Sequence, residues 1–248
     1  MIKAKAKPGS EVVSILAARA IDRKNDRLFF VGMAAAIAAT VVIGFTWSFL
    51  RTDLAKQLHS PWVKAHAGAF IAWILLFFCQ TILVAKQRID IHRRLGIVGG
   101  ILAGLMISLA LGSAFAGFHG SPPRPVLDYF MLYVVVHVDI IMFATLVTAG
   151  LLHRQRPETH KRLMFLATIA LLDAVTERLP LVGHVSGYAS YAILDMFVVC
   201  GILYDLWSRG QVNRAYLWGG LLIFIFPPAS RIIFVATVPH LIGIGRPA

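Results

Sequence analysis

The sequence has few charged residues for its length. Only 15% of its 248 residues are charged, whereas 58% are hydrophobic, and the mean hydropathy is +0.75. A water-soluble domain has about a quarter charged and about half apolar residues, so this composition argues against a soluble protein. The apolar residues form runs of roughly 17–25 residues, the length that crosses a bilayer. These runs are 28–50, 65–85, 95–117, 127–152, 163–183, 187–206 and 215–236.

Cysteine is scarce, and the motifs of several enzyme classes are absent. Cys79 and Cys200 fall within predicted spans, where a lone cysteine behaves as a small hydrophobic residue. The sequence contains no GxxxxGKS/T, GxSxG, CxxC or HExxH. Their absence argues against a phosphate-binding loop, a nucleophile-elbow hydrolase, a redox dithiol and a zinc protease of the HExxH type. The first 27 residues contain no apolar core, so no secretory signal is predicted.

Acidic residues are half as frequent as basic ones, and the basic residues are unevenly distributed. The 24 lysines and arginines outnumber the 12 aspartates and glutamates, which gives a net charge of +12. If the N-terminus is cytoplasmic, the inside segments contain 17 of the 24 basic residues. Those segments are 1–27, 86–94, 153–162 and 207–214. This asymmetry follows the positive-inside rule, so the orientation of the chain in the membrane explains its excess of basic residues. The predicted partner is the lipid bilayer, and no nucleic acid partner is predicted.

We therefore predict an all-α polytopic protein of a bacterial inner membrane, with about seven transmembrane helices and a cytoplasmic N-terminus. A basic cytoplasmic segment covers 1–27, the transmembrane domain covers 28–236, and a short periplasmic tail covers 237–248. The span at 163–183 is the weakest of the seven, because three charged residues interrupt it after ten apolar residues.

Four histidines suggest that a helical hairpin occurs twice. His66 and His92 belong to the first hairpin and His137 and His160 to the second, and "IDIHRRLGIV" is matched later by "PETHKRLMFL". The two hairpins cover 65–117 and 127–183. Parallel repeats related by an axis along the membrane normal are expected to place His66 near His137, and His92 near His160. The same pattern of histidine and basic residues is also typical of anchors at the lipid headgroups.

The order of these four histidines resembles that of the dihaem transmembrane cytochromes b. The resemblance implies two haem b groups, one held by His66 and His137 and the other by His92 and His160. It further implies electron transfer across the membrane and contact with redox partners or other membrane subunits. The stretches "PETHKRLM" and "YDLWSRGQVNRAYLWGG" also resemble bacterial polytopic membrane proteins to which no activity is assigned.

Ionisable residues in the outer halves of the spans support a different interpretation. His66 and His137, together with Glu177 and Asp195, have the chemistry of a periplasm-facing site for a divalent metal ion. Such a site activates water for hydrolysis, so the alternative is a metal-dependent membrane enzyme.

The same charged residues can also be interpreted as ion pairs that hold helices together. Buried carboxylates need partners. The predicted ion pairs between helices are Asp195 with Arg231, and Glu177 with either Arg178 or Arg231. A transporter with a pathway lined by these charges, or an assembly factor, is the remaining alternative.

Overall fold

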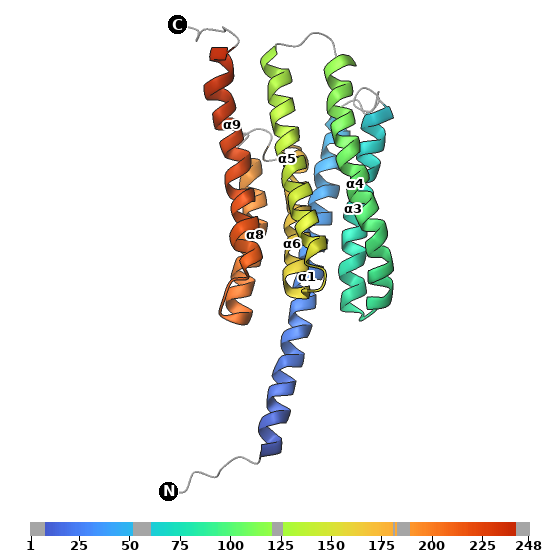
Figure 1. The fold of residues 1–248 in the computed structure, drawn as a ribbon, viewed down its shortest axis with the longest axis vertical. Helices are drawn as coiled ribbons and strands as arrows, with labels where there is room; N and C mark the ends of the chain where they lie inside the picture. Colours follow the sequence, from blue (N-terminus) through green and yellow to red (C-terminus); the bar gives the residue numbers. More distant parts are fainter. Residues whose placement is uncertain (1–7, 52–60, 121–125, 181, 183–188, 242–248) are drawn as a thin grey trace.

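The computed structural model is a bundle of helices that run roughly along one axis (Figure 1). The structure describes residues 8–51, 61–120, 126–180, 182 and 189–241, and no β-strand occurs in these ranges. For 8–23, 113–120, 126–137, 231 and 233–241 it describes the backbone and not the side chains.

Most of the helices overlap the predicted apolar runs. They are α1 (Pro8–Arg51), α3 (Pro61–Ala85), α4 (Ile89–Gly120), α5 (Val126–Leu152), α6 (Pro157–Ala170), α7 (Asp173–Thr176), α8 (Ala189–Arg209) and α9 (Leu221–Leu241), with one π-helical turn, η1 (Tyr216–Gly220), before α9. Within the described ranges, four segments are long and apolar enough to cross a membrane: Lys24–Arg51, Pro61–Ala85, Ile89–Gly112 and Ala189–Arg209. Large apolar side chains also point outwards from the bundle, as lipid-facing surfaces require; Leu75, Ile101 and Leu203 are 58%, 69% and 58% exposed. The chain is thus an all-helical protein with the features of a membrane bundle.

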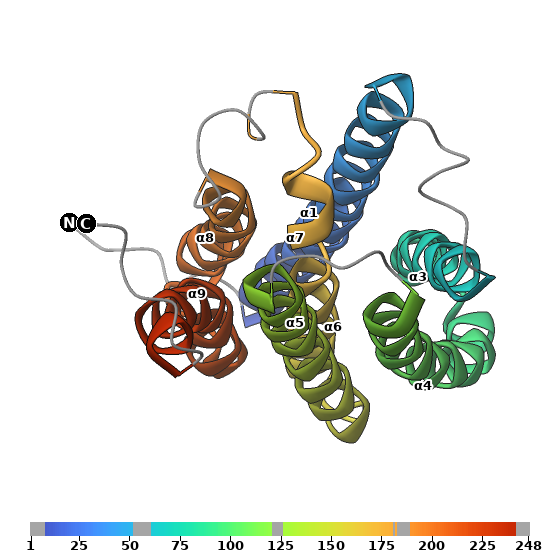
Figure 2. The same cartoon turned by 90° about the horizontal axis from the view of Figure 1, so that it is seen from above.

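Short turns fold consecutive helices into antiparallel hairpins. Residues 86–88 join α3 to α4, and 153–156 join α5 to α6, which begins with a proline in its first turn. The neighbouring pairs α1 and α3, α4 and α5, and α5 and α9 also pack together (Figure 2). The turns 86–88, 153–156 and 210–215 all lie at the end from which the N-terminal part of α1 projects (Figure 1). We call this end, defined by the three turns, the basic end.

The core is centred on α6, which other helices surround. Trp73 of α3 meets Phe143 of α5 edge to face, with ring centroids 5.0 Å apart, and its indole donates a hydrogen bond to the Thr168 hydroxyl of α6 (3.3 Å). Six apolar side chains of α6 are completely buried: Leu163, Phe165, Leu166, Ala167, Ile169 and Ala170. A helix enclosed in this way places the residues of its first turn at the centre of the basic end.

The predicted helix over 163–183 does not form as one continuous element. The first helix, α6, has 14 residues and ends at Ala170, and the single turn α7 follows at Asp173. At 1.5 Å per residue, α6 is about 21 Å long, shorter than a hydrocarbon core of about 30 Å. The predicted hairpin 127–183 therefore differs from the hairpin 65–117, whose second helix, α4, has 32 residues.

Candidate functional site

Two of the four predicted haem ligands meet at the basic end. His92 lies in the first turn of α4 and His160 in the first turn of α6. Their ring centroids are 6.3 Å apart, and the ring planes are inclined at 79°. The hairpin repeat predicted this proximity, and the structure confirms it; the role of the two residues as ligands stays a prediction.

A backbone carbonyl sets the tautomer of His160. The Nδ1 atom of His160 lies 2.7 Å from the carbonyl oxygen of Gly150. A carbonyl oxygen only accepts hydrogen bonds, so Nδ1 carries the proton and Nε2 is the basic nitrogen. Histidines that bind metals are commonly oriented by such a bond from the other ring nitrogen.

Buried polar atoms without partners lie next to this pair. The Nδ1 atom of His92 and the Oε1 atom of Gln80 are buried, and neither has a hydrogen-bond partner in the part of the chain that the structure describes. The Gln80 amide donates to the carbonyl oxygen of His92 (3.3 Å), which joins α3 to the first turn of α4. Buried polar atoms are nearly always satisfied in proteins, so these two mark a place suited to holding a further group.

The other two predicted ligands are described only in part. His66 lies in the first half of α3, and its Nδ1 atom is buried without a partner among the described residues. His137 belongs to α5, but its side chain lies outside the described residues. The predicted pairing of His66 with His137 therefore stays a prediction.

The alternative metal site is not assembled by its described members. Within the described ranges, no group of three or more histidine, cysteine, aspartate or glutamate side chains is placed to hold a metal ion. His66, Glu177 and Asp195 thus do not come together as a metal-binding set. The fourth member, His137, falls among the side chains that are not described.

The predicted ion pairs of the outer half are also not seen among the described side chains. Arg178 donates a hydrogen bond to the carbonyl oxygen of Ala174, and its guanidinium lies 5.7 Å from the ring centroid of Phe45, so its contacts differ from the predicted pair with Glu177. Asp195 has a buried oxygen, Oδ1, without a hydrogen-bond partner in the described part. The side chain of Arg231 is not described, so its pairs with Asp195 and Glu177 stay predictions.

The basic end contains a buried ion pair that the sequence analysis did not predict. Arg162 and Asp205 are both completely buried, and Nε of Arg162 donates to both carboxylate oxygens of Asp205, at 3.1 and 2.9 Å. Nη2 of Arg162 also donates to this carboxylate, and the backbone amide of Asn213 adds a fourth hydrogen bond (3.0 Å). On its other side, Nη1 of Arg162 donates to the backbone carbonyl and the carboxylate of Glu158, at 2.7 and 2.9 Å.

Four further charged groups, one of them Glu158, extend this pair into a network. Asp26 of α1 accepts hydrogen bonds from Lys161 and from Arg209, the latter at 3.1 Å. Glu158 lies 2.8 Å from the Lys161 ammonium and 2.5 Å from the Arg209 guanidinium. We call Asp26, Glu158, Lys161, Arg162, Asp205 and Arg209 the ion network; its three carboxylates balance its three cations, and it joins α1, α6 and α8.

The network changes the acidity of its most exposed member. Burial acts to raise the pKa of Glu158, but the hydrogen bond from Lys161 and the charges of Arg162 and Arg209 outweigh it and lower this pKa to about 2. Glu158 is therefore ionised at any physiological pH.

Spacing in the sequence contains a signal for this network. Glu158 and Arg162 are four residues apart, as are Asp205 and Arg209, and residues at this spacing share a helix face. Each pair occurs at the end of a predicted span, where a carboxylate needs a nearby cation. The spacing indicates the local pairs and not the contact between α6 and α8.

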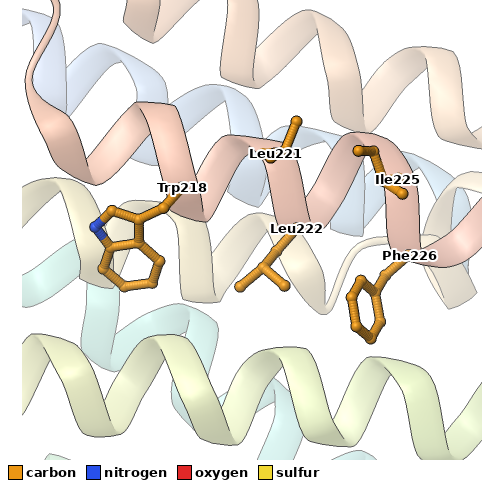
Figure 3. A pocket seen from close by; sticks show the side chains of 5 residues that line it. All are labelled: Trp218, Leu221, Leu222, Ile225 and Phe226. Atoms are coloured by element: carbon orange, nitrogen blue, oxygen red, sulfur yellow. The ribbon is translucent and has the colours of Figure 1, made fainter.

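An apolar groove lies on the surface of η1 and α9 (Figure 3). Its volume is about 350 Å³, and it is lined by Trp218, Leu221, Leu222, Ile225 and Phe226. No ionisable side chain lines the groove, so it offers contacts for hydrocarbon and no groups for catalysis.

Comparison with known proteins found no matching family model, no matching curated protein and no matching solved structure.

Proposed function

We propose that this chain is a b-type cytochrome-like protein of a bacterial inner membrane that binds haem b between His92 and His160. The observation that supports this best is the separation of the two rings. A metal–imidazole bond is about 2 Å long, so two imidazoles on opposite sides of one metal ion place their ring centroids about 6 Å apart. The centroids of His92 and His160 are 6.3 Å apart.

The surroundings of the two rings favour axial ligation as well. The Gly150 carbonyl leaves Nε2 of His160 as the nitrogen that can bind iron. Apart from the histidine pair, α4 and α6 contact each other little, because α5 packs against both. A flat group between the rings therefore displaces few existing contacts between these two helices.

Haem b supplies one-electron redox chemistry when it is bound. The chain's own contribution is to orient the two imidazoles and to surround them with apolar helices. In the full form of the proposal, His66 and His137 hold a second haem nearer the opposite end of the bundle, which provides a path for electrons across the membrane.

The visible spectrum of the detergent-purified protein, produced with ample haem, tests the proposal. We expect a sharp absorption band on reduction, typical of low-spin bis-imidazole haem, and its loss in His92→Ala and His160→Ala. His153→Ala is the matched control, because this histidine lies in the α5–α6 turn that precedes His160 and its Nδ1 also bonds a carbonyl, that of Ala149 (2.9 Å). The control should retain the band.

The same preparation separates the alternatives. A colourless protein with one equivalent of zinc, manganese or iron would replace this proposal with the metal-dependent enzyme. A colourless protein without metal would reject both and favour a transporter or an assembly factor.

A further inference from the structure

Two groups of cations at the basic end differ in their partners. Those of the ion network, Lys161, Arg162 and Arg209, are neutralised by carboxylates. A second group, on the α3–α4 and α5–α6 turns and the first turn of α4, is exposed and has no ion pair in the part of the chain that the structure describes. We call it the basic rim: Lys86, Arg93, Arg94, Arg154 and Arg156.

The acidic residues nearest the basic rim are already engaged. The carboxylate of Asp90 lies 3.5 Å from the guanidinium of Arg88. Glu158 belongs to the ion network, where Lys161 and Arg162 hold it at 2.8 and 2.9 Å. The five positive charges of the rim therefore remain uncompensated by the described protein.

The rim forms one surface although it comes from two turns. The contact between His92 and His160 brings the first turns of α4 and α6 together. Arg93 directly follows His92, and the carbonyl oxygen of Arg156 accepts a hydrogen bond from the backbone amide of His160 (2.9 Å). Each side of the histidine pair thus has an exposed guanidinium within one helical turn.

The backbone adds to the positive potential of this surface. Both α4 and α6 begin at the rim, and a helix N-terminus carries about half a positive charge. The rim also lies at an end of the bundle, at the level where the headgroups of a bilayer meet membrane-spanning helices.

We infer that the basic rim binds the headgroup of an anionic phospholipid with two phosphates, such as diphosphatidylglycerol. The guanidinium group of arginine matches a phosphate in two hydrogen bonds, and each half of the rim provides two arginines: Arg93 and Arg94, and Arg154 and Arg156. Basic surfaces between transmembrane helices are suited to such lipids. The inference does not depend on haem binding.

Native mass spectrometry of the full-length protein with defined lipids tests this inference. We expect diphosphatidylglycerol to be retained in preference to phosphatidylcholine. Removing two rim charges, in Arg154→Gln/Arg156→Gln or in Arg93→Gln/Arg94→Gln, should weaken this binding about 30-fold. The matched control is Lys24→Gln/Arg214→Gln, which removes two exposed cations outside the rim and should leave the binding unchanged.

Three results would overturn the inference. They are equal retention of the two lipids, an equal loss of binding in the control, and displacement of the lipid by inorganic phosphate at a similar concentration, which would indicate a site for the free ion. If neither variant folds, the wild-type protein still provides a test through salt, which screens exposed charges. The preference for the anionic lipid should then fall steeply with ionic strength, and a preference independent of salt contradicts the inference.

Discussion

The ion pair between Arg162 and Asp205 joins two helices of this bundle through buried side chains. Both side chains are completely buried, and the pair joins α6 to α8. A buried ion pair adds little stability relative to an apolar pair of the same shape, but the loss of one partner leaves the other charge unpaired in the interior. The effect of a substitution here therefore depends on which charge is left behind.

We expect Asp205→Ala to lower the free energy of unfolding by about 3–5 kcal/mol, because Arg162 is then buried without its main carboxylate. Chemical unfolding in detergent measures this change. The double variant Arg162→Ala/Asp205→Ala should lose less stability than the two single variants lose together. Strictly additive losses would show that the two side chains do not act as a pair.

Glu158 gives a prediction for the effect of pH on stability. Its pKa is lowered from 4.5 to about 2 in the folded protein, so its stabilising effect is complete above about pH 4.5 and is lost as the pH falls through about 2. The difference in thermal midpoint between wild type and Glu158→Gln should be constant from neutral pH to about pH 5, and should shrink below that. Because the side chain is 48% exposed, we expect a small difference, and one that persists at low pH would indicate a role other than charge.

At the level of the helices, a predicted span agrees with the structure where the apolar run itself determines the ends of the helix. The predicted spans 127–152 and 65–85 nearly coincide with α5 and α3, because the apolar run itself defines a lipid-facing helix. The span 163–183 fails because α6 is enclosed by other helices, so its end at Ala170 depends on packing that hydropathy does not measure.

The histidine pair and the ion network also differ in how far the sequence predicts them. The proximity of His92 and His160 was predictable because the similar stretches around them suggested that the two hairpins correspond. Arg162 and Asp205 are 43 residues apart on helices of different hairpins, and a single sequence does not state that α6 and α8 are neighbours. The i, i+4 spacing indicated ion pairs within helices, which is the local part of the network.

The contact of α8 with η1 provides a test at the level of elements. A Cβ atom on Gly201 of α8 would lie 2.6 Å from Cζ of Tyr216, whose ring is buried beside the Arg162 guanidinium, 5.8 Å away. We expect Gly201→Ala to destabilise the protein by about 1–3 kcal/mol through overpacking, measured as the free energy of unfolding. Gly104→Ala is the control, since nothing lies within 4 Å of its added Cβ, and alanine favours a helix. Equal effects of the two changes would contradict the observed packing of α8 on η1.

For the whole molecule, the alternation of the helices predicts the topology. The three turns of the basic end lie on the same side as the start of α1, and α9 ends on the opposite side (Figure 1). Reporter fusions after Arg94, Arg162 and Arg209 should therefore behave as cytoplasmic, and fusions after His119 and Ala248 as periplasmic. A cytoplasmic reporter at Ala248 would show that the chain crosses the membrane an even number of times.

The ion network also has a consequence for the order in which the protein is made. Asp26 binds Lys161 and Arg209, which lie 135 and 183 residues later in the chain. At a synthesis rate of about 5–20 residues per second, Arg209 leaves the ribosome about 10–40 s after Asp26. Early in this interval α1 is already made, but Asp26 has neither partner; Lys161 is synthesised first and Arg209 only with the end of α8. The last cation to be synthesised completes the network. A chain that stops short of α8 lacks Asp205, so Arg162 is without the carboxylate that binds it in the finished protein.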